Sequence, residues 1–179
     1  MLRIETTRLV LRDFEKNDLP DYIKLRADDK FKRFYSESDV SHANSASLIE
    51  QFVSGTDASP RTMFQLAITT KNGELIGSCG LRLEKYNQAS IGCELAREWQ
   101  RSGYAYEAVR ELIHYGFTKL NIHRLYAEAL SENLAAIKLC DLFGLRKEAE
   151  FIENVYFHGR WWNTSIMALL SREWVYKVK

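Results

Sequence analysis

One amphipathic segment constrains the fold of this chain more than any other feature. From Ala105 to Leu120, apolar side chains recur at three- and four-residue spacing, which predicts a long helix with one buried face. Strand-like segments stand on both sides of it, "ASIGCEL" at 89–95 and "RLYAEAL" at 124–130. A helix between two strands places them side by side and parallel through a right-handed crossover. We therefore expect a ligand site at the carboxyl end of the first strand.

The segments before this unit predict a sheet with flanking helices. Residues 8–14 alternate as a strand does, a capped helix ends near Arg26, and residues 41–55 have helical spacing, whereas residues 28–39 show no periodicity. Two further strands, "MFQLAIT" and "LIGSCGLRL", flank the hairpin signal Asn72-Gly73.

The segments after it complete the pattern. Asn133 is placed to cap a helix that Gly144 ends, and the tail is predicted to be a hairpin that turns at His158-Gly159. The apolar closing segment "SIMALL" either finishes the sheet or pairs with a second subunit. We predict an α+β fold with a mixed central sheet and helices on both of its faces.

Composition restricts the class of protein. With 179 residues, 46% of them hydrophobic, the chain fits a single domain over residues 1–179. A net charge of +1 argues against a nucleic-acid partner, and no apolar run approaches the ~20 residues that a membrane span needs. The cysteines Cys79, Cys93 and Cys140 lack metal-ligand spacing, which predicts reduced thiols, a cytoplasmic location and no metal. We expect a monomer or homodimer.

The turn that opens the long helix is rich in hydrogen-bond donors. The first N–H groups of a helix have no intrahelical partner, and the summed peptide dipoles favour an anion there. Gly103 lets an anion approach the backbone, and Ala105 keeps the next turn narrow. Side-chain donors come from Gln100, Arg101 and Ser102. A lone glycine turn with a solvated Arg101 is the alternative, but the position between a strand and a helix favours a pyrophosphate.

The stretch Gln100-Arg101-Ser102-Gly103-Tyr104-Ala105 resembles the Q/R-x-x-G-x-G/A signature of the GNAT superfamily, the acetyl-CoA-dependent N-acetyltransferases. The resemblance continues through "ETTRLVLRDFEKND", "GELIGSCGL", "GYAYEAVREL", "HRLYAEALSENLAAIKLCDLFGL" and "HGRWWNTSIMALLSREW". These segments look like the branch that includes the ribosomal-protein N-terminal (alanine/serine) acetyltransferases. The implied fold is a single GNAT-like domain whose two central parallel strands splay into a V.

The resemblance also implies where acetyl-CoA would bind. Backbone N–H groups from Arg101 to Tyr106 would hold the pyrophosphate, and the strand at 93–95 would pair with the pantetheine arm through its main chain. Asn133 would contribute its amide to this arm besides capping its helix. The residues assigned to the coenzyme are Cys93, Glu94, Leu95, Arg97, Gln100, Arg101, Ser102, Gly103, Tyr104, Ala105, Tyr106, Asn133 and Ala136.

Three residues are candidates for the catalytic steps. Acetyl transfer needs a neutral amine, so a base or a water must remove its proton. Glu128 lies where some relatives carry a glutamate base, and its alternative role is an ion pair within a strand. Glu94 ranks second, because Glu94 and Leu95 point to opposite faces of their strand and only one of them faces the cleft. Cys140 occupies the position where many relatives have a tyrosine that acts as the acid. Because cysteine is a poor replacement for it, we expect a buried core thiol there, with water, Tyr104 or Tyr106 as the acid.

Three functions remain open at this point. The first is acetyl transfer to a protein N-terminal α-amine, by resemblance to the ribosomal-protein branch. The second is acetyl transfer to a small amine such as a polyamine, an amino-acid derivative or an antibiotic. A closed pocket would favour the small amine, and an open cleft would favour a peptide. The third is an acyl-CoA-binding module with weak catalysis, which the cysteine at position 140 would favour.

Overall fold

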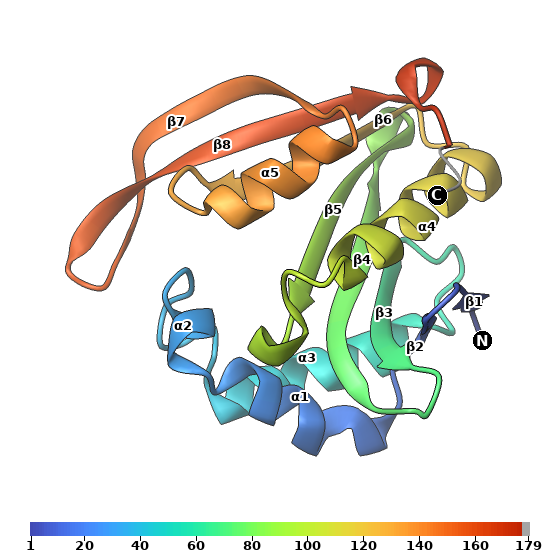
Figure 1. Ribbon diagram of the computed structural model, residues 1–179, viewed down its shortest axis with the longest axis horizontal. Coiled ribbons are helices and arrows are strands. Elements are labelled where there is room, and N and C mark those ends of the chain that lie inside the picture. The colour runs from blue at the N-terminus through green and yellow to red at the C-terminus, as the bar shows by residue number, and fades with distance from the viewer. Residues whose placement is uncertain (177–179) are drawn as a thin grey trace.

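The computed structural model describes residues 1–176 and contains one eight-stranded sheet in the order β1-β2-β3-β4-β5-β6-β8-β7 (Figure 1). The strands are β1 Arg3–Glu5, β2 Leu9–Asp13, β3 Met63–Thr70, β4 Leu75–Glu84, β5 Gln88–Leu95, β6 Arg124–Leu130, β7 Arg146–Phe157 and β8 Arg160–Leu170. The helices are α1 Leu19–Arg26, α2 Asp29–Lys32, α3 His42–Gly55, α4 Tyr104–Lys119 and α5 Leu134–Leu142.

The predicted parallel pair is confirmed, and it is short. Strands β5 and β6 pair only from Gln88 opposite Arg124 to Ser90 opposite Tyr126. Beyond Ser90, β5 continues to pair with β4 as far as Leu95, while β6 pairs with β8 along its whole length. The two central strands therefore separate toward their carboxyl ends and leave one edge of β5 without a strand partner.

Helices cover both faces of the sheet, as predicted (Figure 1). Helix α4 packs on β4 and β5 on one face, where its side chains Ala108, Leu112 and Ile113 join the larger apolar core. Helices α1 and α3 cover the opposite face, where Tyr22 and Phe52 contribute to a smaller core. Because neighbouring strand residues point to opposite faces, β3 and β4 supply both cores: Ala67 and Leu75 join the smaller one, and Leu66 and Ile76 the larger one.

Gly103, just before α4, has a backbone conformation that its sequence position requires. Its φ of 82° is left-handed, which glycine adopts without the Cβ penalty that other residues incur. At the other end of the β5–α4–β6 unit, the Asn133 side chain accepts a hydrogen bond from the Ala136 N–H at 3.3 Å, so the predicted cap of α5 is confirmed.

Three parts of the fold differ from the sequence-based predictions. Strand β1 was not predicted, because three residues carry too little alternation to be recognised. Residues 28–39 contain the four-residue helix α2, whose cap Asp28 accepts hydrogen bonds from the N–H groups of Lys30 and Phe31. The segment "SIMALL" belongs to β8 and so forms part of this chain's own sheet, as one alternative had it, but it lies between β6 and β7 rather than at the edge. Within the described chain, the sheet ends at β7.

Candidate active site

A cavity of about 420 Å³ occupies the space where β5 and β6 separate. Its walls come from both strands, from α4 and α5, and from the segment after α2. Among the lining residues are Phe34, Tyr35, Gly92, Cys93, Val109, Ala127, Glu128, Asn133, Ala136, Leu139, Cys140 and Phe143. The walls are mostly apolar, and Glu128 is the one acidic or basic residue among the lining side chains. A main-chain edge beside an apolar cleft suits a long flexible ligand that carries amide groups.

The amino end of α4 presents free backbone donors next to the end of β5. Within residues 1–176, the N–H groups of residues 101–105 donate to no acceptor. The Gln100 side chain donates to the Leu95 carbonyl at 3.0 Å and so fixes the start of this loop. Arg101 adopts a left-handed φ of 64°, which turns the chain tightly toward Gly103. The free N–H groups and the helix dipole together favour an anion at this loop, as the sequence predicted.

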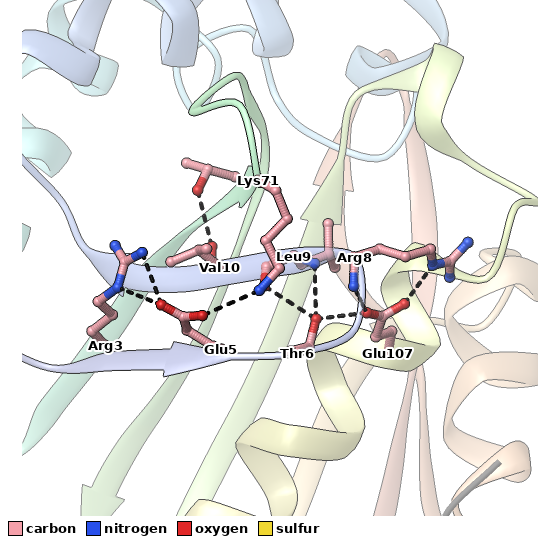
Figure 2. Close-up of polar contacts among 9 residues, drawn as sticks. Arg3, Glu5, Thr6, Arg8, Leu9, Val10, Lys71 and Glu107 are labelled. Atoms are coloured by element: carbon pink, nitrogen blue, oxygen red, sulfur yellow. Dashed lines mark hydrogen bonds and ion pairs between the residues drawn. The ribbon is translucent and has the colours of Figure 1, made fainter.

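A buried carboxylate in the first turn of α4 holds this loop in place (Figure 2). Glu107 Oε1 accepts hydrogen bonds from the Thr6 hydroxyl at 2.6 Å and the Arg8 N–H at 2.7 Å, and Oε2 pairs with Arg8 Nε at 2.6 Å. The same Arg8 donates through Nη1 to the Ser102 carbonyl at 2.9 Å. The turn between β1 and β2 is thereby joined to the loop before α4.

Sequence reasoning missed Arg8 and Glu107 as supporting residues of this site. They are far apart in the chain, and neither belongs to the glycine signature. A carboxylate in the first turn of a helix was the available signal, because a negative charge is favourable there. Burial alone would raise the pKa of Glu107, but the hydrogen bonds from Thr6 and Arg8 outweigh it and lower this pKa below its ordinary value.

We expect Glu107→Gln to lower the free energy of unfolding by about 2 kcal/mol near neutral pH, because charge-assisted hydrogen bonds are lost. Since the folded-state pKa lies below the ordinary value of 4.5, the native carboxylate contributes its full stability above that value. That contribution is lost as the pH falls through the folded-state pKa. Urea unfolding at a series of pH values measures the difference between the two proteins.

Glu50→Gln, at an exposed position on α3, is the control for this experiment. Partial exposure of Arg8, whose side chain is 43% accessible, lets solvent screen part of the ion pair, so most of the expected loss comes from the hydrogen bonds. A difference between wild type and Glu107→Gln that stays constant down to strongly acidic pH would contradict this assignment.

Glu128 lines the larger cavity with a free carboxylate. It lies on β6, its residue is exposed, and within residues 1–176 it makes no hydrogen bond or ion pair. Tyr126 lies two residues earlier on the same face of β6. Its hydroxyl donates a hydrogen bond to Glu84 at 2.7 Å rather than to Glu128. The structure therefore does not show the ion pair that was the alternative role for Glu128.

Glu94 has a different environment from Glu128. Its Oε1 accepts a hydrogen bond from the Ser78 hydroxyl at 2.9 Å, and its Oε2 lies 3.9 Å from Nε of the buried Arg26. Leu95 belongs to the core under α4, so Glu94 points to the face of α1 and α3. Glu94 lines neither of the two cavities described here.

Burial raises the pKa of both thiols that line the larger cavity. It raises the pKa of Cys93 to about 12, with a further contribution from the charge of Glu94, and it raises the pKa of Cys140 to about 11, with a smaller one from Asp141. Proton transfer from Cys140 to a leaving thiolate of pKa ~8.5 would be unfavourable by about 3 kcal/mol. This mismatch favours the interpretation of Cys140 as a core thiol.

We expect Cys140→Ala to lower stability by about 1 kcal/mol, a typical value for a small buried truncation, and to leave turnover nearly unchanged. Denaturant unfolding and initial rates measure the two effects. Cys79→Ala is the matched control, because Cys79 is fully buried and lines neither of these cavities. A loss of turnover beyond about tenfold in Cys140→Ala alone would identify it as an acid.

A second cavity, of about 260 Å³, lies between α2 and the loop that precedes α4. It is lined by Asp28, Lys30, Phe31, Arg97, Gln100 and Arg101. Residues predicted to bind the coenzyme are thus divided in the structure. Cys93, Asn133 and Ala136 line the larger cavity, Arg97, Gln100 and Arg101 line the smaller one, and Glu94, Leu95 and residues 102–106 line neither.

Residues 8–146 match the acetyltransferase (GNAT) domain family, and the chain belongs to that family. A relative described as uncharacterized N-acetyltransferase p20 of Bacillus licheniformis is 28% identical over 97% of this chain and 99% of its own length. The predicted GNAT fold is therefore confirmed, and the chain is an acyltransferase.

Two solved structures have the same fold. The ribosomal-protein-S5-alanine acetyltransferase of Vibrio fischeri is 18% identical, has a TM-score of 0.83, and matches over 98% of this chain and 100% of its own. The spermidine N-acetyltransferase of Vibrio cholerae, solved with CoA and spermine, is 23% identical and has a TM-score of 0.79. The match covers 92% of this chain and 96% of its own. Ribosomal-protein acetyltransferases are thus among the structural neighbours, as expected. Within residues 1–176, no helix is long and apolar enough to cross a membrane.

Proposed function

We propose that this chain transfers an acetyl group from acetyl-CoA directly to a protein N-terminal α-amine. The observation that supports this most strongly is the 420 Å³ cavity between β5 and β6, which runs beside an unpaired strand edge and is lined by Glu128. Acetyl-CoA, as a co-substrate, would supply the activated thioester. The residues that fit it are the free N–H groups of residues 101–105 for its phosphates and the edge of β5 for its amide-containing arm.

The chain's own residues account for the proton transfers around the reaction. In this proposal, the Glu128 carboxylate accepts a proton from the acceptor ammonium, directly or through water, and the neutral nitrogen then attacks the thioester carbon. The C–N bond forms as the C–S bond breaks, the sulfur leaves as a thiolate, and the proton that the attacking nitrogen must still lose passes through water to that thiolate. Because a thiol of pKa ~8.5 leaves passably as its anion, water suffices as the final proton donor.

The choice between a peptide and a small amine depends on the shape of the acceptor side. The larger cavity is partly open to solvent, and its lining includes Glu128 and the aromatic residues Phe34 and Tyr35. Its single carboxylate favours a peptide, because a polyamine pocket needs several acidic groups to balance its charges. The spermidine acetyltransferase neighbour is the observation in favour of the second candidate, a small polyamine.

Product analysis tests the proposed function. The protein is incubated with acetyl-CoA and a panel of peptides with free N-termini, and with spermidine and aminoglycosides as small amines. Mass spectrometry locates the acetyl group while thiol release gives the rate. We expect acetylation of peptide α-amines. Turnover confined to small amines would exclude the peptide acceptor, and thiol release without any acetylated amine would exclude acetyl transfer.

A further inference from the structure

The smaller cavity, here called the basic cavity, has an unbalanced charge. Three of its lining residues, Lys30, Arg97 and Arg101, are cationic, and one, Asp28, is acidic. The Asp28 carboxylate is occupied, since its Oδ1 accepts the N–H groups of Lys30 and Phe31, both at 3.0 Å. The 260 Å³ space is therefore surrounded by an excess of positive charge.

The three cationic side chains have no partners in the part of the chain that the structure describes. None of them forms a hydrogen bond or an ion pair within residues 1–176, whereas the nearby Lys32 pairs with Asp29 at 3.9 Å. Like charges that converge on a hollow repel one another, and an anion in the hollow relieves that repulsion. The arrangement thus favours a negatively charged ligand.

An aromatic pair joins the basic cavity to the larger cavity. Phe31 and Tyr35 stack with their ring centroids 4.9 Å apart and their planes 5° apart. Phe31 lines the basic cavity, and Tyr35 lines the larger one that contains Glu128. The two cavities therefore lie on either side of one aromatic wall.

A buried cation lies against this wall. Arg26 is only 4% exposed, and its guanidinium carbon is 5.7 Å from the Tyr35 ring centroid and 6.0 Å from that of Phe31. Its Nε and Nη1 atoms have no hydrogen-bond partner in the described chain. Its Nε lies 3.9 Å from Glu94 Oε2, so a carboxylate balances this charge, and the excess of positive charge at the basic cavity comes from its own three cationic side chains.

We propose that the basic cavity binds a carboxylate or phosphate that the acceptor carries beyond its amine, so that the acceptor is an acidic peptide. This inference rests on the proposed function and specifies its substrate class. With its amine at Glu128, a peptide that extends past the Phe31–Tyr35 pair brings its acidic side chains to Lys30, Arg97 and Arg101. A polyamine would place further positive charge at the same position and be repelled.

Lys30→Glu tests this inference, because Lys30 was not assigned to the coenzyme. The probes are three tetrapeptide amides, Ser-Asp-Glu-Phe, Ser-Asn-Gln-Phe and Ser-Lys-Lys-Phe. We expect the wild-type protein to have a KM for the acidic peptide at least about fivefold below its KM for the neutral peptide. Its KM for the basic peptide should be higher than both. In Lys30→Glu this preference should disappear, and in wild type it should weaken with added salt. Lys24→Glu, an exposed position on α1 outside both cavities, should keep it.

Separate measurements distinguish this inference from the proposed function. Calorimetry of the N-acetylated acidic and neutral peptides on the CoA-saturated protein reports the charge preference without turnover. Equal affinity for the two peptides would overturn the inference even if both parent peptides are acetylated. A Lys30→Glu effect on the KM of acetyl-CoA that vanishes with the 3′-dephospho coenzyme would also overturn it, because the cavity would then serve the coenzyme.

Discussion

Replacement of Glu128 by glutamine should reduce kcat by about a hundredfold or more, the usual contribution of a positioned general base. The larger cavity contains no other lining carboxylate, and Glu128 is free of partners within the described chain. Glutamine keeps the shape of the side chain but accepts no proton. Affinity for CoA should be unchanged, since the helix end and the β5 edge are untouched. Stopped-time thiol assays and calorimetry measure the two quantities.

The dependence on pH gives this prediction a second test. If Glu128 removes the proton, the residual rate of Glu128→Gln should rise with pH as more of the amine becomes neutral in solution. Glu132→Gln is the matched control, because Glu132 pairs with Arg160 at the surface and lines neither of the cavities described. A kcat for Glu128→Gln equal to that of this control would remove Glu128 from the mechanism and return attention to Glu94.

Gly103→Val should weaken CoA binding by about a hundredfold or more, equivalent to ~2.7 kcal/mol. Valine at a φ of 82° is strongly disfavoured, so the loop must change its conformation and its N–H groups no longer converge. A Cβ at this position would meet only Nη2 of Arg8, at 3.4 Å, so it would project into the space expected for the phosphates. Calorimetric titration with CoA measures the loss.

Strain from a positive φ needs a control of its own. Gly73 has a φ of 89° in the turn between β3 and β4, and a Cβ there would meet no atom within 4 Å. Gly73→Val should therefore lose stability to a similar extent and keep its affinity for CoA. Wild-type affinity in a folded Gly103→Val would exclude the pyrophosphate assignment, whereas an equal loss in both variants would show that general destabilisation is the cause.

The β5–α4–β6 unit could be predicted because its signals are local. The helical periodicity of residues 105–120 predicted α4, and the strand-like segments on either side of it predicted the parallel pair. The cap at Asn133 could likewise be recognised within four residues, because it bonds to the Ala136 N–H. Alternation along β5 predicted that Glu94 and Leu95 point to opposite faces, but it could not say which of them packs under α4 or that neither lines the larger cavity. The packing of α4, which buries Leu95, decides the first of these.

Contacts between segments that are distant along the chain could not be predicted from the sequence. The bonds from Thr6 and Arg8 to Glu107 join segments about a hundred residues apart, and no local pattern links them. The position of β8 between β6 and β7 likewise depends on which strand pairs with β6, and no local pattern determines this. The basic cavity is a further case, since Lys30 and Arg97 meet only because α2 lies beside the loop before α4.

The most direct test of the central claim is hydrogen exchange of backbone amides with and without CoA. If the coenzyme lies between β5 and β6 with its phosphates at the start of α4, amides in residues 91–95 and 101–106 should exchange more slowly when CoA is bound. Strands β2 and β3 should be unaffected, because they lie on the far side of β4. Protection confined to other segments, with residues 91–95 and 101–106 unchanged, would contradict the proposed site.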